Sequence, residues 1–329
     1  MRTRIDVIVS RRSCHYNRGV GVAVLRIGIA VTVLHILGTN FNNRHYLWGP
    51  DGVVPRESGA GPALEMLNPW VIPRSNAQLD VVWGLTVIIA VAVICRGHRI
   101  AVGALAYSVI GLIERNPLVT DGGDNLLIIL LPMLLLCRSD LYLAWDAAQR
   151  RRLVDDDPAL GKVIHNAGIT LIVFQICVVY AVASYWKLGG ELWQDGTALY
   201  YIGQLGEFSG WRPMSSLLTH PIVATLATYI VVLLQLAVAP SVATNRGTRL
   251  LVPGLIVMHS GIATTMGLAS FGVIMISADC FLMKDRDFHQ LREYTHVIGR
   301  RKGQLVFRSS ALPSPRPNAS GAGSSDTPP

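Results

Sequence analysis

Long apolar runs separated by short polar stretches are the strongest pattern along the chain. A membrane-spanning helix needs roughly 20 mainly apolar residues, and the shorter runs need shielding by neighbours or a locally thinner bilayer. The pattern predicts an all-α integral membrane protein, a polytopic helical bundle of about eight transmembrane segments. The eight segments lie at about 19–37, 79–95, 100–114, 124–137, 166–186, 221–239, 250–267 and 270–283.

The composition supports this class of protein. Hydrophobic residues make up 51% of the 329 residues and charged residues only 15%, whereas soluble domains carry roughly 25% charged residues. The net charge of +8 raises the question of a nucleic-acid partner. The basic residues, however, lie between and beyond the apolar runs. We therefore expect no nucleic-acid partner, and we expect the lipid bilayer to surround the bundle.

The distribution of basic residues predicts how the bundle is oriented. Cytoplasmic loops of membrane proteins carry an excess of lysine and arginine. If the N-terminus is cytoplasmic, 22 of the 29 Lys and Arg residues lie in inner segments, six lie in outer loops, and Arg26 lies within the first helix. Both termini are therefore predicted to be cytoplasmic.

Three regions follow from this arrangement. Residues 1–18 form a basic cytoplasmic arm, residues 19–283 the transmembrane domain, and residues 284–329 a basic cytoplasmic tail. The tail is rich in Ser, Pro, Gly and Ala from about residue 309 and is expected to be disordered from there. The inner loop 138–162 carries RRR followed by DDDP and is predicted to be a solvated linker.

Polar groups inside the apolar runs are candidates for function, because each is costly in hydrocarbon unless it finds a partner. His259 lies about ten residues into its segment, roughly 15 Å deep. It either packs between helices, or it handles protons or orients a ligand. Arg26 and Asp279 lie at matching depth near the inner edge, so we predict a structural ion pair between them. Gln235 is predicted to hydrogen-bond across helices.

The motif TDGGDN begins the fourth segment. Asp121 and Asp124 either cap this helix, or Asn125 points into an outward-facing cavity. No pair of histidines or carboxylates within a span has the spacing of metal ligands, so no metal site is expected.

The stretch Ser184–Leu199, SYWKLGGELWQDGTAL, is the most unusual end of an apolar run. The charge distribution places it on the outer face. Lys187 either snorkels to water or faces an apolar cavity, where desolvation favours its neutral form and lets it act as a base or nucleophile. Asp195 is predicted to cap a short helix over Gly196–Glu207.

Two motifs in this order resemble the HTTM (horizontally transferred transmembrane) superfamily, which is related to the vitamin K-dependent gamma-carboxylases. One is Y-W-K-L-x₄-W-x-D-G-T-A, and the other is HSGIATTMGLASFGVIMISAD from His259. The segment GDNLL and the helix around Arg26 are similar more loosely. The first motif contains Lys187, Leu188, Trp193, Asp195, Gly196, Thr197 and Ala198.

The resemblance implies a role for two residues. Lys187 matches the lysine that serves the carboxylases as a base in vitamin K hydroquinone oxidation, and His259 matches a histidine important to their activity. These two are therefore the candidate catalytic residues, and a quinone or vitamin K hydroquinone is the implied cofactor. The residues expected to support them are Trp193, Asp195, Gly196, Thr197, Asp124, Asn125, Arg26 and Asp279.

The likeness is closer to short bacterial members of the sporulation-delaying-protein B type than to the carboxylases, which carry a large extracytoplasmic C-terminal region. It implies a multi-pass protein of the cell inner (plasma) membrane that matures or modifies an exported peptide or protein, with a membrane or soluble accessory protein as a further partner. Whether the chain is an enzyme stays open. The alternative is a non-catalytic binding, export or immunity partner that retains the fold.

Overall fold

The chain divides into two units, Met1–Asp285 and Arg286–Pro329. The predicted arm is described only from residue 15, and the tail beyond residue 293 lies outside the described residues. In the second unit, residues 286–291 are helical, and Arg286 Nε lies 3.8 Å from Asp287 Oδ1. The computed structural model describes residues 15–55, 67–154, 157–206, 210–211, 213, 216–244, 247–291 and 293.

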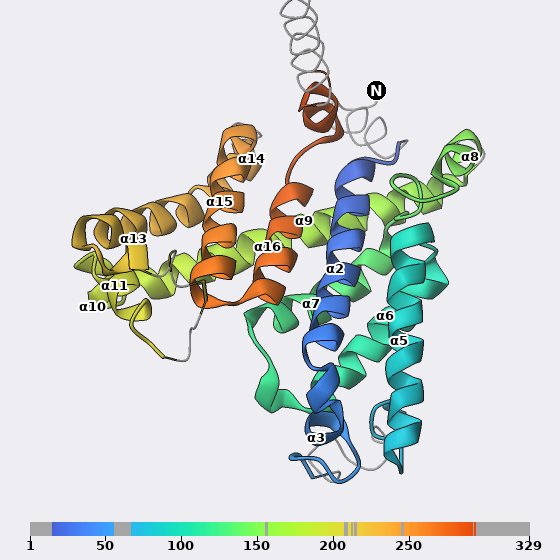
Figure 1. The fold of residues 1–329 in the computed structure, drawn as a ribbon. Coiled ribbons are helices and arrows are strands. Elements are labelled where there is room, and N and C mark those ends of the chain that lie inside the picture. The colour runs from blue at the N-terminus through green and yellow to red at the C-terminus, as the bar shows by residue number, and fades with distance from the viewer. Residues whose placement is uncertain are drawn as a thin grey trace, which may run out of the picture. The chain divides into compact units, whose positions relative to one another are not determined.

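Helices form all the regular structure in these described ranges, and each of the eight predicted segments coincides with one (Figure 1). Shorter helical elements join them: η1 (Phe41–Asn43), α3 (Arg44–Trp48), η2 (Pro117–Val119), α8 (Ala147–Arg152), α10 (Glu191–Gln194), α11 (Ala198–Ile202), η4 (Ser216–Thr219) and α14 (Val238–Thr244). The eight are α2 (Gly19–Thr39), α5 (Asn76–Arg96), α6 (Arg99–Arg115), α7 (Gly122–Leu136), α9 (Ala159–Leu188), α13 (Pro221–Leu236), α15 (Thr248–Met266) and α16 (Ala269–Phe281).

Within the described residues, five helices are long and apolar enough to cross a membrane. They are α2, α5, α9, α13 continued through α14, and α15, while α7 and α16 are shorter apolar helices. The chain is therefore an all-helical, multi-pass membrane protein. The number of eight spans and the orientation of the bundle remain predictions.

The first and last helices of the bundle, α2 and α16, pack against each other. Gly28 allows a close approach, because a Cβ atom there would lie 1.8 Å from Ser277 Oγ. Small residues of this kind let membrane helices pack backbone to backbone. The backbone N–H groups of Gly19 and Val20 donate to the Asp285 carboxylate at 3.0 and 2.9 Å. The start of α2 and the end of α16 therefore lie at the same end of the bundle.

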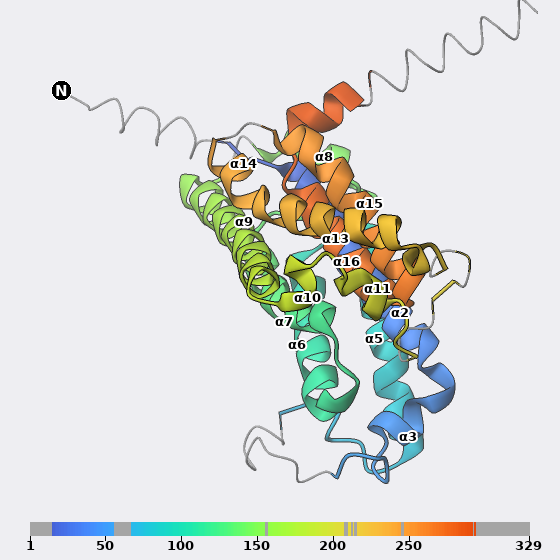
Figure 2. The ribbon, with the colours of Figure 1, turned by 90° about the vertical axis from the view of Figure 1, so that its left-hand side faces the viewer.

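The longest helix, α9, has 30 residues and is about 45 Å long, which exceeds the roughly 30 Å hydrocarbon core. A helix of this length fits a bilayer by tilting. In Figure 1 it runs obliquely across the view, whereas α2, α5 and α15 run up it. It contacts α7, α13 and α14 and brings its C-terminal end beside α10 and α11 (Figure 2).

The prediction of a solvated linker at 138–162 is wrong, because part of this loop forms α8 and several of its charged side chains pair. Residues 155–156 of this loop lie outside the described residues. Arg138 Nη1 lies 2.5 Å from Asp157 Oδ2, and its Nε lies 3.0 Å from Asp140 Oδ1. Arg150 Nη1 lies 2.6 Å from the other oxygen of Asp140, whose residue is only 6% exposed. We call Arg138, Asp140, Arg150 and Asp157 the inner-loop network.

The predicted ion pair between Arg26 and Asp279 is also wrong. Arg26 is fully buried, and its Nη2 donates to the carbonyl oxygen of Leu143 at 2.6 Å. It points towards the turn between α5 and α6, where a Cβ atom at Gly97 would lie 1.8 Å from its Nη1. Asp279 instead faces His259 and Tyr180. The residues match in depth but point in different directions around their helices.

Candidate functional site

The loop after α9 is held in place by a left-handed glycine. Gly196 has φ +72°, and a Cβ atom there would lie 2.8 Å from Thr225 Cγ2. The Tyr229 hydroxyl donates to the Gln194 carbonyl at 2.8 Å and ties the loop to α13. The predicted helix 196–207 capped by Asp195 is wrong. Asp195 follows the end of α10, Gly196 turns the chain, and α11 occupies only Ala198–Ile202.

Thr197 closes this loop on itself. Its backbone N–H donates to the Leu192 carbonyl at 2.9 Å, and its hydroxyl reaches the same oxygen at 3.4 Å. Thr197 immediately precedes α11, and its side chain makes no capping hydrogen bond there. Asp195 is exposed. The Asp-Gly-Thr turn therefore shapes the loop, and its side chains do not line the large cavity described below.

Lys187 lies in the last turn of α9 beside Trp193 of α10. Its Nζ is 5.0 Å from the centroid of the Trp193 ring, a cation–π distance. The Nζ also reaches the Ala183 carbonyl one turn back, at 3.4 Å. Among the described residues no carboxylate forms an ion pair with Lys187. A ring face and a carbonyl oxygen are thus its neighbours.

His259 is fixed by a buried carboxylate. Its Nδ1 lies 2.8 Å from Asp279 Oδ2, and the Tyr180 hydroxyl donates to the other carboxylate oxygen. All three residues are buried, and the Phe271 ring packs edge-on against the imidazole at 5.9 Å. With the carboxylate ionised, Nδ1 carries the hydrogen and Nε2 is left as an acceptor. Within the described ranges Nε2 makes no hydrogen bond.

A cavity of about 670 Å³ brings the candidate catalytic residues together. Side chains from α7, α9, α10, α11, α13, α15 and α16 line it. Lys187, Trp193 and His259 are all among them. Most of the remaining lining is aliphatic, including Val179, Ile230 and others. Its size and its apolar wall with a few polar groups are typical of a ligand-binding site.

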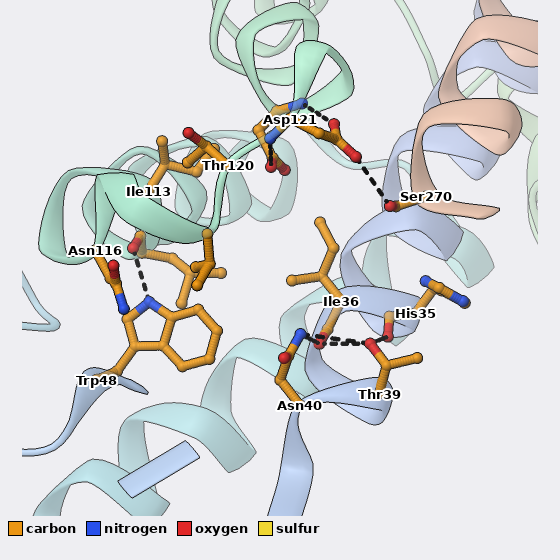
Figure 3. Close-up of a pocket in the computed structure, with 13 residues that line it drawn as sticks. His35, Ile36, Thr39, Asn40, Trp48, Ile113, Asn116, Thr120, Asp121 and Ser270 are labelled. Carbon is orange, nitrogen blue, oxygen red and sulfur yellow. Dashed lines mark hydrogen bonds between the residues drawn. The ribbon is translucent and has the colours of Figure 1, made fainter. Parts of the chain in front are cut away.

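A second, smaller cavity of about 100 Å³ lies beside the start of α7 (Figure 3). Asp121 and Asp124 form a capping box there, since the Asp121 side chain accepts from the N–H of Asp124 at 3.2 Å and Asp124 Oδ2 accepts from the N–H of Asp121 at 2.9 Å. Ser270 of α16 reaches Asp121 Oδ2 at 3.4 Å. The capping prediction is confirmed. Asn125 takes no part in the cap and lines the larger cavity.

Sequence reasoning missed two residues of α9 that belong to the site. Tyr180 holds Asp279, and Gln175 lines the large cavity. Residues 175, 179, 183 and 187 all line it, and a spacing of four places them along one face of a helix. That spacing was the signal that could have found Gln175.

The predicted hydrogen bond of Gln235 across helices is wrong. Its side chain lines the cavity, is 7% exposed, and makes no hydrogen bond to any described residue. The predicted residues thus separate into four places. The large cavity is lined by Lys187, His259, Trp193 and Asn125, and Asp279 lies behind His259. The adjoining loop contains Asp195, Gly196 and Thr197. Asp124 borders the small cavity, and Arg26 lies near the turn between α5 and α6.

Comparison with known proteins gives one distant relative. The chain is similar to the uncharacterized protein YitO of Bacillus subtilis (strain 168), with 28% identity over 198 residues, which cover 59% of this chain and 63% of YitO. The chain therefore matches less than two thirds of that relative. No family model matches, and no solved structure matches. Function has to be argued from the site.

Proposed function

We propose that this protein modifies or matures an exported peptide or protein at an outward-facing site, as a membrane protein of the HTTM type with Lys187 as the base. The observation that carries the proposal is the shared cavity. Lys187 of α9 and His259 of α15, 72 residues apart, line the same apolar space together with Trp193. The bacterial inner membrane and the outward orientation are part of the proposal and rest on the sequence.

The surroundings of Lys187 suit a proton acceptor. A lysine base must be neutral, and removal from water disfavours the charged form of an amine. The Trp193 face and the apolar lining exclude water from one side of Nζ. No ion pair with a carboxylate of the described chain holds the ammonium form in place. General bases typically contribute 10²–10⁴-fold to rate.

His259 is arranged to act on a second atom of the same substrate. Asp279 holds its Nδ1, so that only Nε2 is left for a hydrogen bond or a proton. Tyr180 occupies the other oxygen of Asp279 and fixes the carboxylate. The ring therefore presents one defined nitrogen rather than two.

The residues present also fit the cofactor that the resemblance implies. An apolar cavity with an aromatic ring and two nitrogen bases suits a quinone or hydroquinone, and Lys187, Trp193 and His259 would hold its ring. When bound, such a group supplies redox chemistry that protein side chains lack.

The alternative function is a non-catalytic binding, export or immunity partner that retains the fold. In that case Lys187 snorkels to the water interface, and its cation–π contact with Trp193 anchors the end of α9. Arginine would serve equally well in that role but not as a neutral base.

Mass spectrometry of secreted peptides distinguishes the two functions. Lys187→Ala and Lys187→Arg are each expected to lower the amount of modified product 100-fold or more, while membrane levels of the protein stay normal. Lys162→Ala, on the inner half of the same helix, is the matched control and should keep the product. Full activity of Lys187→Arg would refute the base role.

A further inference from the structure

Three carboxamide side chains line the large cavity without a protein partner. They are Asn125 of α7, Gln175 of α9 and Gln235 of α13, and none of them makes a side-chain hydrogen bond in the described part of the chain. Asn and Gln in membrane bundles normally hydrogen-bond across helices. A buried polar group that lacks a partner costs free energy. Gln235 is such a buried group, whereas Gln175 is half-buried and Asn125 is exposed. Three amides from three helices that lack a protein partner around one cavity point to an occupant that supplies the partners.

Gln235 is the clearest of the three. Its residue is 7% exposed, and its Oε1 is buried without a partner. Leucine would fill the same space at no such cost, and α13 is otherwise almost entirely aliphatic at this end, with the sequence VVLLQL. The fold therefore gives no structural reason for an amide at this position.

The chemistry of the three groups selects the class of occupant. Each carboxamide offers an N–H donor and a C=O acceptor side by side, and a peptide bond offers the complementary pair. An acyl chain offers neither. Gln175 and Lys187 are 12 residues apart on α9, or about 18 Å, which matches about five residues of extended peptide at roughly 3.3 Å each.

The cavity is also open to such an occupant. Val257 and Ile230 both line it, yet they are 72% and 53% exposed. The cavity therefore reaches the apolar outer surface of α13 and α15, and a segment can enter without separating the helices. Its aliphatic wall suits apolar side chains.

We infer that the cavity binds an extended, apolar peptide segment whose backbone is recognised by Asn125, Gln175 and Gln235. This inference rests on the proposed function, because it names the part of the exported substrate that the site takes. The segment runs past the amides towards Lys187. Its peptide groups satisfy the carboxamides, and its side chains replace lipid or water against the aliphatic wall.

Photo-crosslinking tests the inference with the full-length protein in lipid nanodiscs. The probe is acetyl-(Leu-Ala)₃-amide carrying one diazirine-bearing leucine, and the control probe is the same peptide with every backbone N–H methylated. The plain probe is expected to label the α13–α15 region and to bind at least tenfold more tightly than the methylated probe. Gln235→Leu and Gln175→Leu are each expected to lower its affinity about tenfold, since each removes one or two hydrogen bonds.

Gln149→Leu, the same change on the exposed face of α8, is the matched control. Equal binding of the two probes, or unchanged affinity in both Gln235→Leu and Gln175→Leu, would overturn the inference. So would displacement of the probe by 1-hexadecanol in wild type but not in Gln235→Leu, which would assign the amides to a lipid. Thermal unfolding of Gln235→Leu shows that the variant is folded.

The inference and the proposed function can fail separately. Lys187→Ala should still bind the probe if the amides recognise the backbone. Probe binding together with a fully active Lys187→Arg would refute the base and keep the peptide site. Loss of product in Lys187→Ala without any amide-dependent binding would keep the base and refute the peptide site.

Discussion

Polar side chains have protein partners in the inner-loop network, whereas several of those that line the large cavity lack them. In the network, Asp140 is only 6% exposed, and both its oxygens lie within ion-pair distance of Arg138 and Arg150. In the cavity, the amides of Gln175 and Gln235 have no partner among the described residues. Polar groups that the fold needs are paired within it. Polar groups that stay unpaired beside a cavity are available to a ligand.

The pKa of Asp140 reflects this pairing. Burial raises the pKa of this carboxyl, but the hydrogen bonds from Arg138 and Arg150 outweigh it and hold the pKa below its ordinary value. A group with a lowered pKa in the folded state stabilises the fold above its unfolded pKa of about 3.9. That contribution is lost as the pH falls through the lower, folded value.

The largest effect on stability is expected for Asp279, the paired carboxylate that lies behind the cavity residue His259. Asp279→Ala leaves both His259 and Tyr180 without their buried partner, and it should lower the free energy of unfolding by about 3 to 5 kcal/mol. Thermal unfolding in detergent measures this. Tyr180→Phe, which removes one hydrogen bond, is the milder control at about 1 kcal/mol. A change of under 1 kcal/mol in Asp279→Ala would contradict the role of this carboxylate.

A smaller loss is expected in the inner-loop network. Arg138→Ala should lower the free energy of unfolding by about 2 kcal/mol, because Asp140 and Asp157 each lose a charged hydrogen bond. Denaturation measured at several pH values should show this cost shrinking as the pH falls through the lowered pKa of the Asp140 carboxyl. Arg152→Ala, at an exposed position at the end of α8, should change stability by less than about 0.5 kcal/mol. Equal effects of the two substitutions would remove the distinction between paired and unpaired charges.

The smallest change in stability, and one of opposite sign, is expected for a substitution inside the cavity. Gln235→Leu replaces an amide without a partner by an apolar side chain of similar size. It should leave stability unchanged or raise it by about 1 kcal/mol in the absence of a ligand. Thermal unfolding in detergent is again the measurement. A loss of 2 kcal/mol or more would mean that the amide has a structural partner after all, and the contrast between the two regions would disappear.

The positions of the helices could be predicted from the sequence, because long apolar runs have one stable arrangement in a bilayer. The directions in which side chains point around these helices could not be predicted. The depth of Arg26 and Asp279 followed from counting residues along each helix, but a count says nothing about which way a side chain points around the helix. Tyr180 was overlooked for a related reason, since a tyrosine in an apolar run looks like ordinary packing until its hydroxyl is seen beside Asp279.

The loops were the least predictable part. Asp195 has the chemistry of a helix cap, but the left-handed Gly196 after it ends one short helix before the next begins. In the inner loop, the charges of RRR and DDDP looked like a solvated stretch. Arg150 of the first run pairs with Asp140, and Asp157 of the second pairs with Arg138. Both partners lie in another part of the loop, and local sequence does not encode these contacts.

The outward position of Lys187 is the central claim, and it can be measured directly by chemical labelling of the lysines. The sequence contains four lysines, of which Lys162, Lys284 and Lys302 are predicted to be cytoplasmic and Lys187 alone to face outwards. Intact cells are treated with a membrane-impermeant amine reagent, and each site is quantified by mass spectrometry before and after permeabilisation. The account predicts labelling of Lys187 in intact cells and of Lys162 and Lys284 only after permeabilisation. Labelling of Lys162 or Lys284 in intact cells, with Lys187 protected, would contradict it.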